Sequence, residues 1–198
     1  MIAWPPIQTR LGVAADGSAG PVTYAALFNK IAGHPLGERG AALGVGAHAF
    51  FSLYRIDSPL RLAHFLGQTA HESELYWYLR ELWGPTPAQI RYEGRLDLGN
   101  TQAGDGHLFL GRGILQITGR ANYRACGQRI SVDLEGNPQL AERPDIAVQT
   151  ACDFWAAHEL NALADADDVN GLTRKINGGL NGLSDRIALT EIAKGILA

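Results

Sequence analysis

The chain has 198 residues, of which 46% are hydrophobic and 19% charged, a balance that is typical of a globular protein and excludes a disordered one. The length suits one domain, alone or with a small appendage. The formal net charge of −3 argues against a dedicated nucleic-acid-binding protein. The two cysteines, Cys126 and Cys152, are too few for a disulfide framework or a zinc site of the usual four-ligand kind, and we expect buried thiols.

The N-terminal residues contain no basic region followed by an apolar run, which a secretory signal requires. No stretch of the chain approaches the ~18 continuous apolar residues of a membrane-spanning helix. We therefore expect no signal peptide and no membrane span, and a chain that is made and kept in the cytoplasm. We also expect a monomer, because nothing in the sequence indicates dimerisation.

Helical signals follow one another along most of the chain. Residues 7–33 indicate two short helices around a turn, and a helix resumes at about 40–54 after a glycine-rich connection. Ser58 and Pro59 are typical of a helix N-terminus, and the helix that they begin carries an apolar stripe. Further helices are expected at 87–93, 120–130, 144–158, 168–177 and 184–197.

The segment ILQIT is the best candidate for a strand. Since side chains alternate across a strand, Gln116 and Thr118 would share one face with Ile114, while Leu115 and Ile117 would point into the core. The polar pair could line a groove for a sugar and orient a water molecule; the alternative is an ordinary half-exposed strand. The predicted fold class is therefore mainly α, with a small β element in the middle of the chain.

Glu72 lies at the end of the helix that begins near Pro59. At about 100° per residue, it falls on the flank of the apolar stripe, whereas His71 falls on the polar side. A carboxyl that is partly shielded from water in this way suits a general acid. The alternative is a buried glutamate in a structural ion pair with an arginine.

Acid–base hydrolysis of a glycosidic bond needs a second carboxyl opposite the first. Glu81 follows Glu72 by nine residues. In one unbroken helix the two residues would be about 13 Å apart and would lie on opposite faces. Glu81 can therefore face Glu72 only if the helix ends between them and the chain turns back. Glu93 and Asp105 are the other candidates. Two carboxyls about 6.5–9.5 Å apart suit an inverting hydrolysis, and a separation of about 5 Å suits a retaining one. The sequence does not give this distance.

Three motifs, in this order, resemble those of the glycoside hydrolase family 19 chitinases: AHES at 70–73, GRGILQITGRANY at 111–123 and KINGGLNGLSDR at 175–186. The segment between the first two is similar to the phage and prophage relatives, which are often labelled endolysins. The resemblance covers roughly residues 50–197, and residues 8–31 resemble a truncated peptidoglycan-binding module. We therefore expect a small helical segment at 1–33 and a catalytic domain at 34–198.

The resemblance implies a lysozyme-like α+β fold, mainly α, with a small β-hairpin beside a deep cleft, and an inverting mechanism. Glu72 resembles the family's general acid. Glu81 matches the general base of phage-type members, whereas the longer spacing in plant chitinases would match Glu93. Thr118 occupies the position that helps to hold the attacking water. Four more residues match cleft positions that bind substrate: Gln116, Asn122, Tyr123 and Asn177. Arg186 resembles an arginine that supports the acidic cluster.

Two positions depart from the family pattern. Glu74-Leu75 stand where Gly-Gly often follows the first motif, and Asn181 stands where a glutamate often follows the NGG sequence. The first departure could alter the turn beside Glu72, and the second could remove a charge from the site. Neither removes the two main carboxylates.

The implied function is that of an endolysin, which cleaves β-1,4 bonds in peptidoglycan glycan strands. Chitin-type polymers of N-acetylglucosamine are the alternative substrate. An endolysin without a signal peptide would leave the cytoplasm through a separate holin. One rival hypothesis is an inactive glycan-binding protein, which the departures at 74–75 and 181 favour. The other is a zinc peptidase, but Leu75 stands where a zinc helix needs its second histidine, so we expect no metal and no cofactor.

Overall fold

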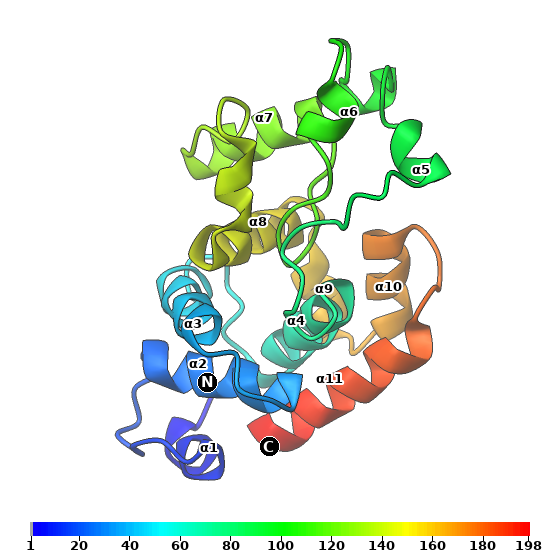
Figure 1. Ribbon diagram of the computed structural model, residues 1–198. Helices are drawn as coiled ribbons and strands as arrows, with labels where there is room; N and C mark the ends of the chain where they lie inside the picture. Colours follow the sequence, from blue (N-terminus) through cyan, green and yellow to red (C-terminus); the bar gives the residue numbers. More distant parts are fainter. Residues whose placement is uncertain (1) are drawn as a thin grey trace.

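The computed structural model describes residues 2–198, and within them helices dominate (Figure 1). Only isolated β-bridges join Arg80 to Arg112 and Arg112 to Ile117. The helices in chain order are α1 (Trp4–Leu11), α2 (Pro21–Ala32), α3 (Glu38–Phe50), α4 (Pro59–Glu72), α5 (Pro87–Ile90), η1 (Leu96–Leu98), α6 (Asp105–Leu108), α7 (Arg120–Ile130), η2 (Pro138–Glu142), α8 (Pro144–Ala157), α9 (Leu160–Asp165), α10 (Val169–Asn177) and α11 (Leu183–Leu197).

Helix α4 lies in the middle of the larger body of the molecule, with α2, α3 and α11 around it (Figure 1). It begins as the sequence predicts, because Ser58 Oγ accepts a hydrogen bond from the amide of Arg61 and Pro59 occupies the first turn. Its Phe65 ring meets Phe51 and Trp155 edge to face. The aromatic contacts join α4 to the residue that follows α3 and to α8, so that one core holds the helix in place.

The N-terminal helices share this core. Ile7 of α1 and Leu27 and Phe28 of α2 are buried in the same apolar cluster as the side chains of α4 and α11. The Nε of Arg10 donates to the carbonyl of Ile196, 3.1 Å away, which joins α1 to the end of the chain. Residues 2–33 are thus packed on the rest of the molecule, and their relation to peptidoglycan-binding modules stays a prediction.

A second, smaller core lies under α7 and α8 in the upper part of the molecule (Figure 1). It contains Phe109, Ile117, Tyr123, Cys126, Ile130, Leu134, Ala141 and Ile146. Both cysteines are free and buried, as predicted. Between residues 82 and 119 the chain forms only the short helices α5, η1 and α6, joined by turns.

The strand and the small β-hairpin predicted around 114–118 are wrong. The segment forms a turn, and only Ile117 makes a bridge there, to Arg112. Ile114 and Leu115 are buried in the large core, whereas Ile117 is buried in the second core. A strand presents alternate residues to opposite faces, so it cannot place adjacent Ile114 and Leu115 in one core and Ile117 in another.

The crossing of α4 and α11 depends on Gly67. A Cβ added there would clash with Thr190 Oγ1 and would lie 2.9 Å from the backbone N and Cα of Thr190. Because backbone atoms cannot move aside as a flexible side chain would, a larger residue must separate the helices. Gly195, on α11, has nothing within 4 Å of the same position.

We predict that Gly67→Ala lowers the free energy of unfolding by about 1–3 kcal/mol through overpacking. Gly195→Ala serves as the matched control and should raise it by about 0.5–1 kcal/mol through helix propensity. Urea denaturation of both variants measures the difference. A Gly67→Ala protein as stable as wild type would contradict the tight crossing.

Candidate active site

Helix α4 ends at Glu72, and the chain then turns through three successive left-handed residues. Glu74, Leu75 and Tyr76 have φ angles of 48°, 57° and 67°, each costing a non-glycine residue about 1–2 kcal/mol. Ser73 holds the turn: its Oγ donates to the carbonyl of Thr69 at 2.6 Å and accepts from the amide of Tyr76 at 3.1 Å. The condition that the helix ends between Glu72 and Glu81 is therefore met. The turn lies where the family often has glycines.

Glu72 is held by a buried arginine from α11. The Nη2 of Arg186 donates to Glu72 Oε1, and its Nη1 donates to Gln68 Oε1 at 2.6 Å. The Nε donates to the carbonyl of Asn181 at 3.2 Å. The Arg186 side chain is 0% exposed and that of Glu72 is 23% exposed. No donor among residues 2–198 contacts Glu72 Oε2, so the arginine orients the carboxyl group and leaves one oxygen free for chemistry.

His71 and Asp185, which directly precede Glu72 and Arg186 in the sequence, also contact each other. His71 Nδ1 lies 2.6 Å from Asp185 Oδ2, so successive residues of α4 meet successive residues of α11. Gly182, with φ +71°, lies against the His71 ring, where a Cβ would clash. The two contacts fix the end of α4 against the beginning of α11. Asn181, the second departure from the family pattern, contributes its backbone carbonyl to Arg186.

Glu81 is held by a different part of the chain. Its Oε2 accepts from the amide of Gly111 at 3.1 Å, and its Oε1 accepts from Gln89 Nε2 at 3.0 Å and from the hydroxyl of Tyr92 at 3.3 Å. Its own amide donates to the carbonyl of Gly111 at 2.8 Å. Burial raises the pKa of Tyr92, and the Glu81 carboxylate raises it further. The three neutral donors orient the carboxylate and place no positive charge next to it.

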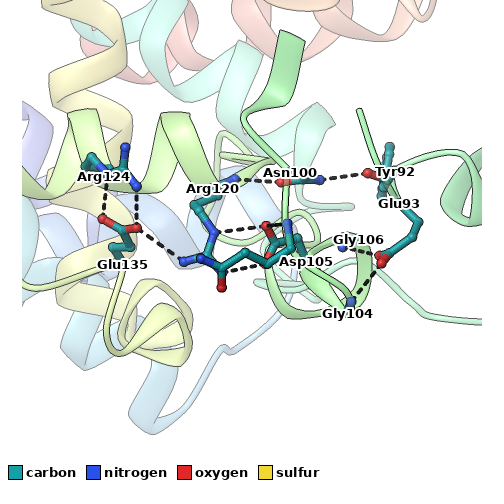
Figure 2. Close-up of polar contacts among 10 residues, drawn as sticks. Tyr92, Glu93, Asn100, Gly104, Asp105, Gly106, Arg120, Arg124 and Glu135 are labelled. Carbon is teal, nitrogen blue, oxygen red and sulfur yellow. Dashed lines mark hydrogen bonds and ion pairs between the residues drawn. The ribbon is translucent and has the colours of Figure 1, made fainter. Parts of the chain in front are cut away.

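The alternative carboxylates hold loops instead (Figure 2). Glu93 accepts from the amides of Gly104 at 2.7 Å and Gly106 at 2.8 Å. Asp105 is buried and paired with Arg120, whose Nε donates to it at 2.9 Å. Glu93 thus holds backbone amides of its own loop, and Asp105 joins that loop to α7.

The loop is joined to α7 by an ionic cluster, which we name the upper clasp: Asp105, Arg120, Arg124 and Glu135 (Figure 2). Arg124 and Arg120 hold the pKa of Glu135 at about 2, and Arg120 lowers the pKa of Asp105. The amide of Arg120 also donates to Asn100 Oδ1 at 2.9 Å. The clasp fixes the N-terminus of α7, directly after Thr118.

Gln116, Thr118 and Asn122 line one pocket of about 370 Å³. Asn122 Nδ2 donates to the carbonyl of Thr118 at 2.8 Å, and the Thr118 hydroxyl has no partner among residues 2–198. Gln116 also approaches Glu81: a Cβ on Gly111 would clash with Gln116 Oε1 and lie 3.3 Å from Glu81 Oε2. The structure thus brings the predicted water-holding residue, two predicted cleft residues and Glu81 into one region.

The structure differs from the prediction at one of the substrate-binding positions, Tyr123. Tyr123 is 0% exposed; its hydroxyl donates to the carbonyl of Leu110 at 2.7 Å and accepts from Arg112 Nη1 at 3.1 Å, and burial raises its pKa. A phenol without accessible surface supports the fold rather than touching a sugar. Arg186 is equally buried and pairs with Glu72, the place that its implied supporting role requires. Asn177 is exposed at the end of α10 and stays a prediction.

Sequence reasoning missed Gln89 and Tyr92, which donate to Glu81. It also missed Gln68, which accepts from the arginine that holds Glu72. Only Gln89 carries a readable signal, because Thr86 and Gln89 form a capping box at the start of α5. Within residues 2–198, no three His, Cys, Asp or Glu side chains group in a way that could hold a metal ion. None of the helices in this part of the chain has the length and apolar character to cross a membrane.

The sequence of the chain is similar to those of known proteins. Residues 57–174 match the chitinase class I family. A glycosyl hydrolase family 19 domain-containing protein of Haemophilus influenzae is 41% identical over 98 residues, covering 50% of this chain and 47% of the relative. Chitinase 6 of Oryza sativa subsp. japonica is 33% identical over 129 residues, covering 63% and 45%. The chain thus spans less than half of the length of these curated relatives.

Solved structures share the fold. The crystal structure of chitinase C from Streptomyces griseus HUT6037 aligns with a TM-score of 0.69 at 22% identity, over 91% of this chain and 95% of that one. A bacterial family 19 chitinase aligns with a TM-score of 0.63 at 20% identity, over 88% and 94%. The mainly α class is confirmed, and the fold is that of family 19 chitinases.

We predict acid sensitivity of the upper clasp. The folded-state pKa of Glu135, about 2, lies below the ordinary value of 4.5. The clasp therefore stabilises the protein above pH ~4.5, and this contribution is lost as the pH falls from ~4.5 towards ~2. Glu135→Gln should lower stability at pH 7 by up to about 1 kcal/mol and should show a shallower loss in that window. Denaturation at several pH values measures the free energy of unfolding, with the exposed Glu159→Gln as the control. Equal slopes of this free energy against pH for wild type and Glu135→Gln would contradict the prediction.

Proposed function

The chain belongs to the chitinase class I family of glycoside hydrolases, family 19, and from this membership we propose that it hydrolyses β-1,4 bonds in glycans that contain N-acetylglucosamine. The observation that carries the proposal is the pair of separately held carboxylates. Glu72 keeps one free oxygen beside a buried arginine, and Glu81 accepts three hydrogen bonds from neutral donors.

In the proposed reaction, Glu72 gives its proton to the glycosidic oxygen as the bond from that oxygen to C1 breaks. Glu81 takes a proton from a water molecule, whose oxygen forms the new bond to C1 from the opposite side. The free hydroxyl of Thr118 orients that water. The products are a sugar with a new hydroxyl at C1, in inverted configuration, and the released alcohol.

We place peptidoglycan first among the substrates, because the segment between the first two motifs is similar to phage-type relatives. The similarity to a protein named Chitinase 6 favours chitin as the second candidate. Both polymers contain N-acetylglucosamine in β-1,4 linkage, so the same pair of carboxylates could act on either.

We predict that the wild-type protein releases new reducing sugar ends from purified Gram-negative peptidoglycan, detected by mass spectrometry. Glu72→Gln should lower the rate by about 10²–10⁴, while the variant stays folded because the amide oxygen still accepts from Arg186. Chitin oligomers tested in parallel decide between the substrates. Cleaved peptides with intact glycan would contradict the mechanism. Retained wall binding without any cleavage by wild type would instead support a glycan-binding protein.

Substitution of each candidate residue tests whether Glu81 or Glu93 is the general base. Glu81→Gln should lower kcat at least 100-fold, since the amide cannot take a proton from water. Glu93→Gln should leave kcat within a few-fold and cost about 1 kcal/mol of stability, because it disturbs the hydrogen bonds from Gly104 and Gly106. Steady-state kinetics and thermal unfolding measure both. A large loss of kcat in Glu93→Gln alone would make Glu93 the base.

A further inference from the structure

The left-handed turn between the two candidate carboxylates is contacted by three side chains from the N-terminal part of the chain. They lie on α2, on the connection between α2 and α3, and on α3, and we name them the N-terminal brace: Phe28, His34 and Arg39. Their contacts are with Tyr76 and Trp77, in the middle of the segment between the carboxylates. We infer that the brace fixes Glu81 relative to Glu72 and is thus a positioning element of the acid–base pair, an inference that rests on the proposed function.

Arg39 binds the backbone of the turn. Its Nη1 donates to the carbonyl of Tyr76 at 3.1 Å and to that of Trp77 at 2.9 Å. Within residues 2–198 the guanidinium forms no ion pair with a carboxylate, so its hydrogen bonds serve these two carbonyls. A charged donor forms hydrogen bonds that are about twice as strong as those of a neutral one, which suits a group that holds backbone in place.

Two aromatic contacts hold the side chains of the same residues. The His34 ring stacks on Trp77, with centroids 4.5 Å apart and 19° between the planes. The Tyr76 ring meets Phe28 edge to face at 5.0 Å, and both of these rings are buried. The brace therefore holds the backbone and the side chains of Tyr76 and Trp77 together.

The turn needs this support because its backbone is unfavourable. Glu74, Leu75 and Tyr76 are left-handed, a conformation that strains residues other than glycine and persists only where the surrounding structure holds it. The first part of the turn is held by Ser73 and by the amide of Leu75, which donates to the carbonyl of Ala70 at 2.7 Å. The brace holds the second part, from which the chain runs directly to the candidate base.

The brace and the departure from the family pattern belong together. The brace comes from residues 28–39, outside the 57–174 segment that matches the chitinase family. A glycine pair would adopt the left-handed turn unaided. Since Glu74 and Leu75 stand there instead, the N-terminal helices supply the contacts that keep the turn in place.

The first test is kinetic and uses whichever substrate the wild-type protein cleaves, the hexamer of N-acetylglucosamine or peptidoglycan. Arg39→Gln should lower kcat at least tenfold, since misplacement of a catalytic group by about 1 Å costs up to about 100-fold, with KM within about threefold. Arg39→Lys should keep most of the activity, because a single nitrogen makes both hydrogen bonds. Arg10→Gln is the matched control, because Arg10 also donates from an N-terminal helix to a backbone carbonyl, that of Ile196. Equal kcat in Arg39→Gln and Arg10→Gln, or a raised KM with unchanged kcat, would overturn the inference.

A second substitution in the turn separates positioning from a general loss of stability. In the Arg39→Gln background, Glu74→Gly should recover at least threefold of the lost kcat, because glycine adopts the left-handed backbone without strain. Glu74→Gln keeps the Cβ and should recover none of it. Equal kcat in these two double variants would contradict the role of the brace in holding the turn.

The third test does not depend on turnover and follows backbone amide exchange by NMR. The amides of Tyr78 and Glu81 form backbone hydrogen bonds of 3.0 and 2.8 Å at the end of the turn. Both amides should exchange at least tenfold faster in Arg39→Gln and in His34→Ala, which removes only the stacking on Trp77, and at the wild-type rate in the control variant. Equal exchange in all of these proteins would overturn the inference.

Failure of the proposed function is a separate result, in which the wild-type protein cleaves neither chitin oligomers nor peptidoglycan. Amide exchange then decides by itself whether the brace holds the turn. If the wild type cleaves while the brace variants match it in kcat and in exchange, only the brace is excluded.

Discussion

The buried guanidinium of Arg186 sets the relation between α4 and α11 and hence the place of Glu72. Removing a charged group from water costs several kcal/mol unless it is paired and hydrogen-bonded. Arg186 meets this requirement with Glu72, Gln68 and the carbonyl of Asn181. The helices can approach closely enough for these contacts because Gly67 presents no side chain to Thr190, one turn beyond Arg186 on α11. Glu72 is thus both the candidate acid and an acceptor for the buried guanidinium.

The two carboxylates belong to parts of the chain that are stabilised differently. Glu72 ends a helix in the large core, whereas Glu81 is held by the loop amide of Gly111 and by side chains around α5. The residues between them form a left-handed turn. Glycine would adopt this turn without strain, but Glu74 and Leu75 adopt it because Ser73 and the buried Tyr76 hold it from both ends. The departure from the family pattern therefore places two non-glycine residues in a left-handed turn.

Local signals predicted the long helices well. Ser58 and Pro59 mark the start of α4, and α7, α8, α10 and α11 lie within a few residues of their predicted ranges. The pairing of Glu72 with Arg186 could not be derived from spacing, because 114 residues separate them; only the resemblance between motifs suggested it. Spacing also did not decide whether Glu81 or Glu93 is the general base. Their difference lies in tertiary partners, since Glu93 caps loop amides and Glu81 faces Gln116 across Gly111.

The absence of the predicted strand explains how the site is assembled. In an extended strand, residue 116 would lie about 16 Å from residue 111, at about 3.3 Å per residue. The turn at 113–116 instead folds Gln116 back over Gly111, where only a glycine leaves room for Gln116 Oε1 and Glu81 Oε2 together. The same turn sends Ile114 and Leu115 into one core and Ile117 into the other. The two cores thus anchor the turn from both sides, and the turn connects Glu81 with the pocket that holds Thr118.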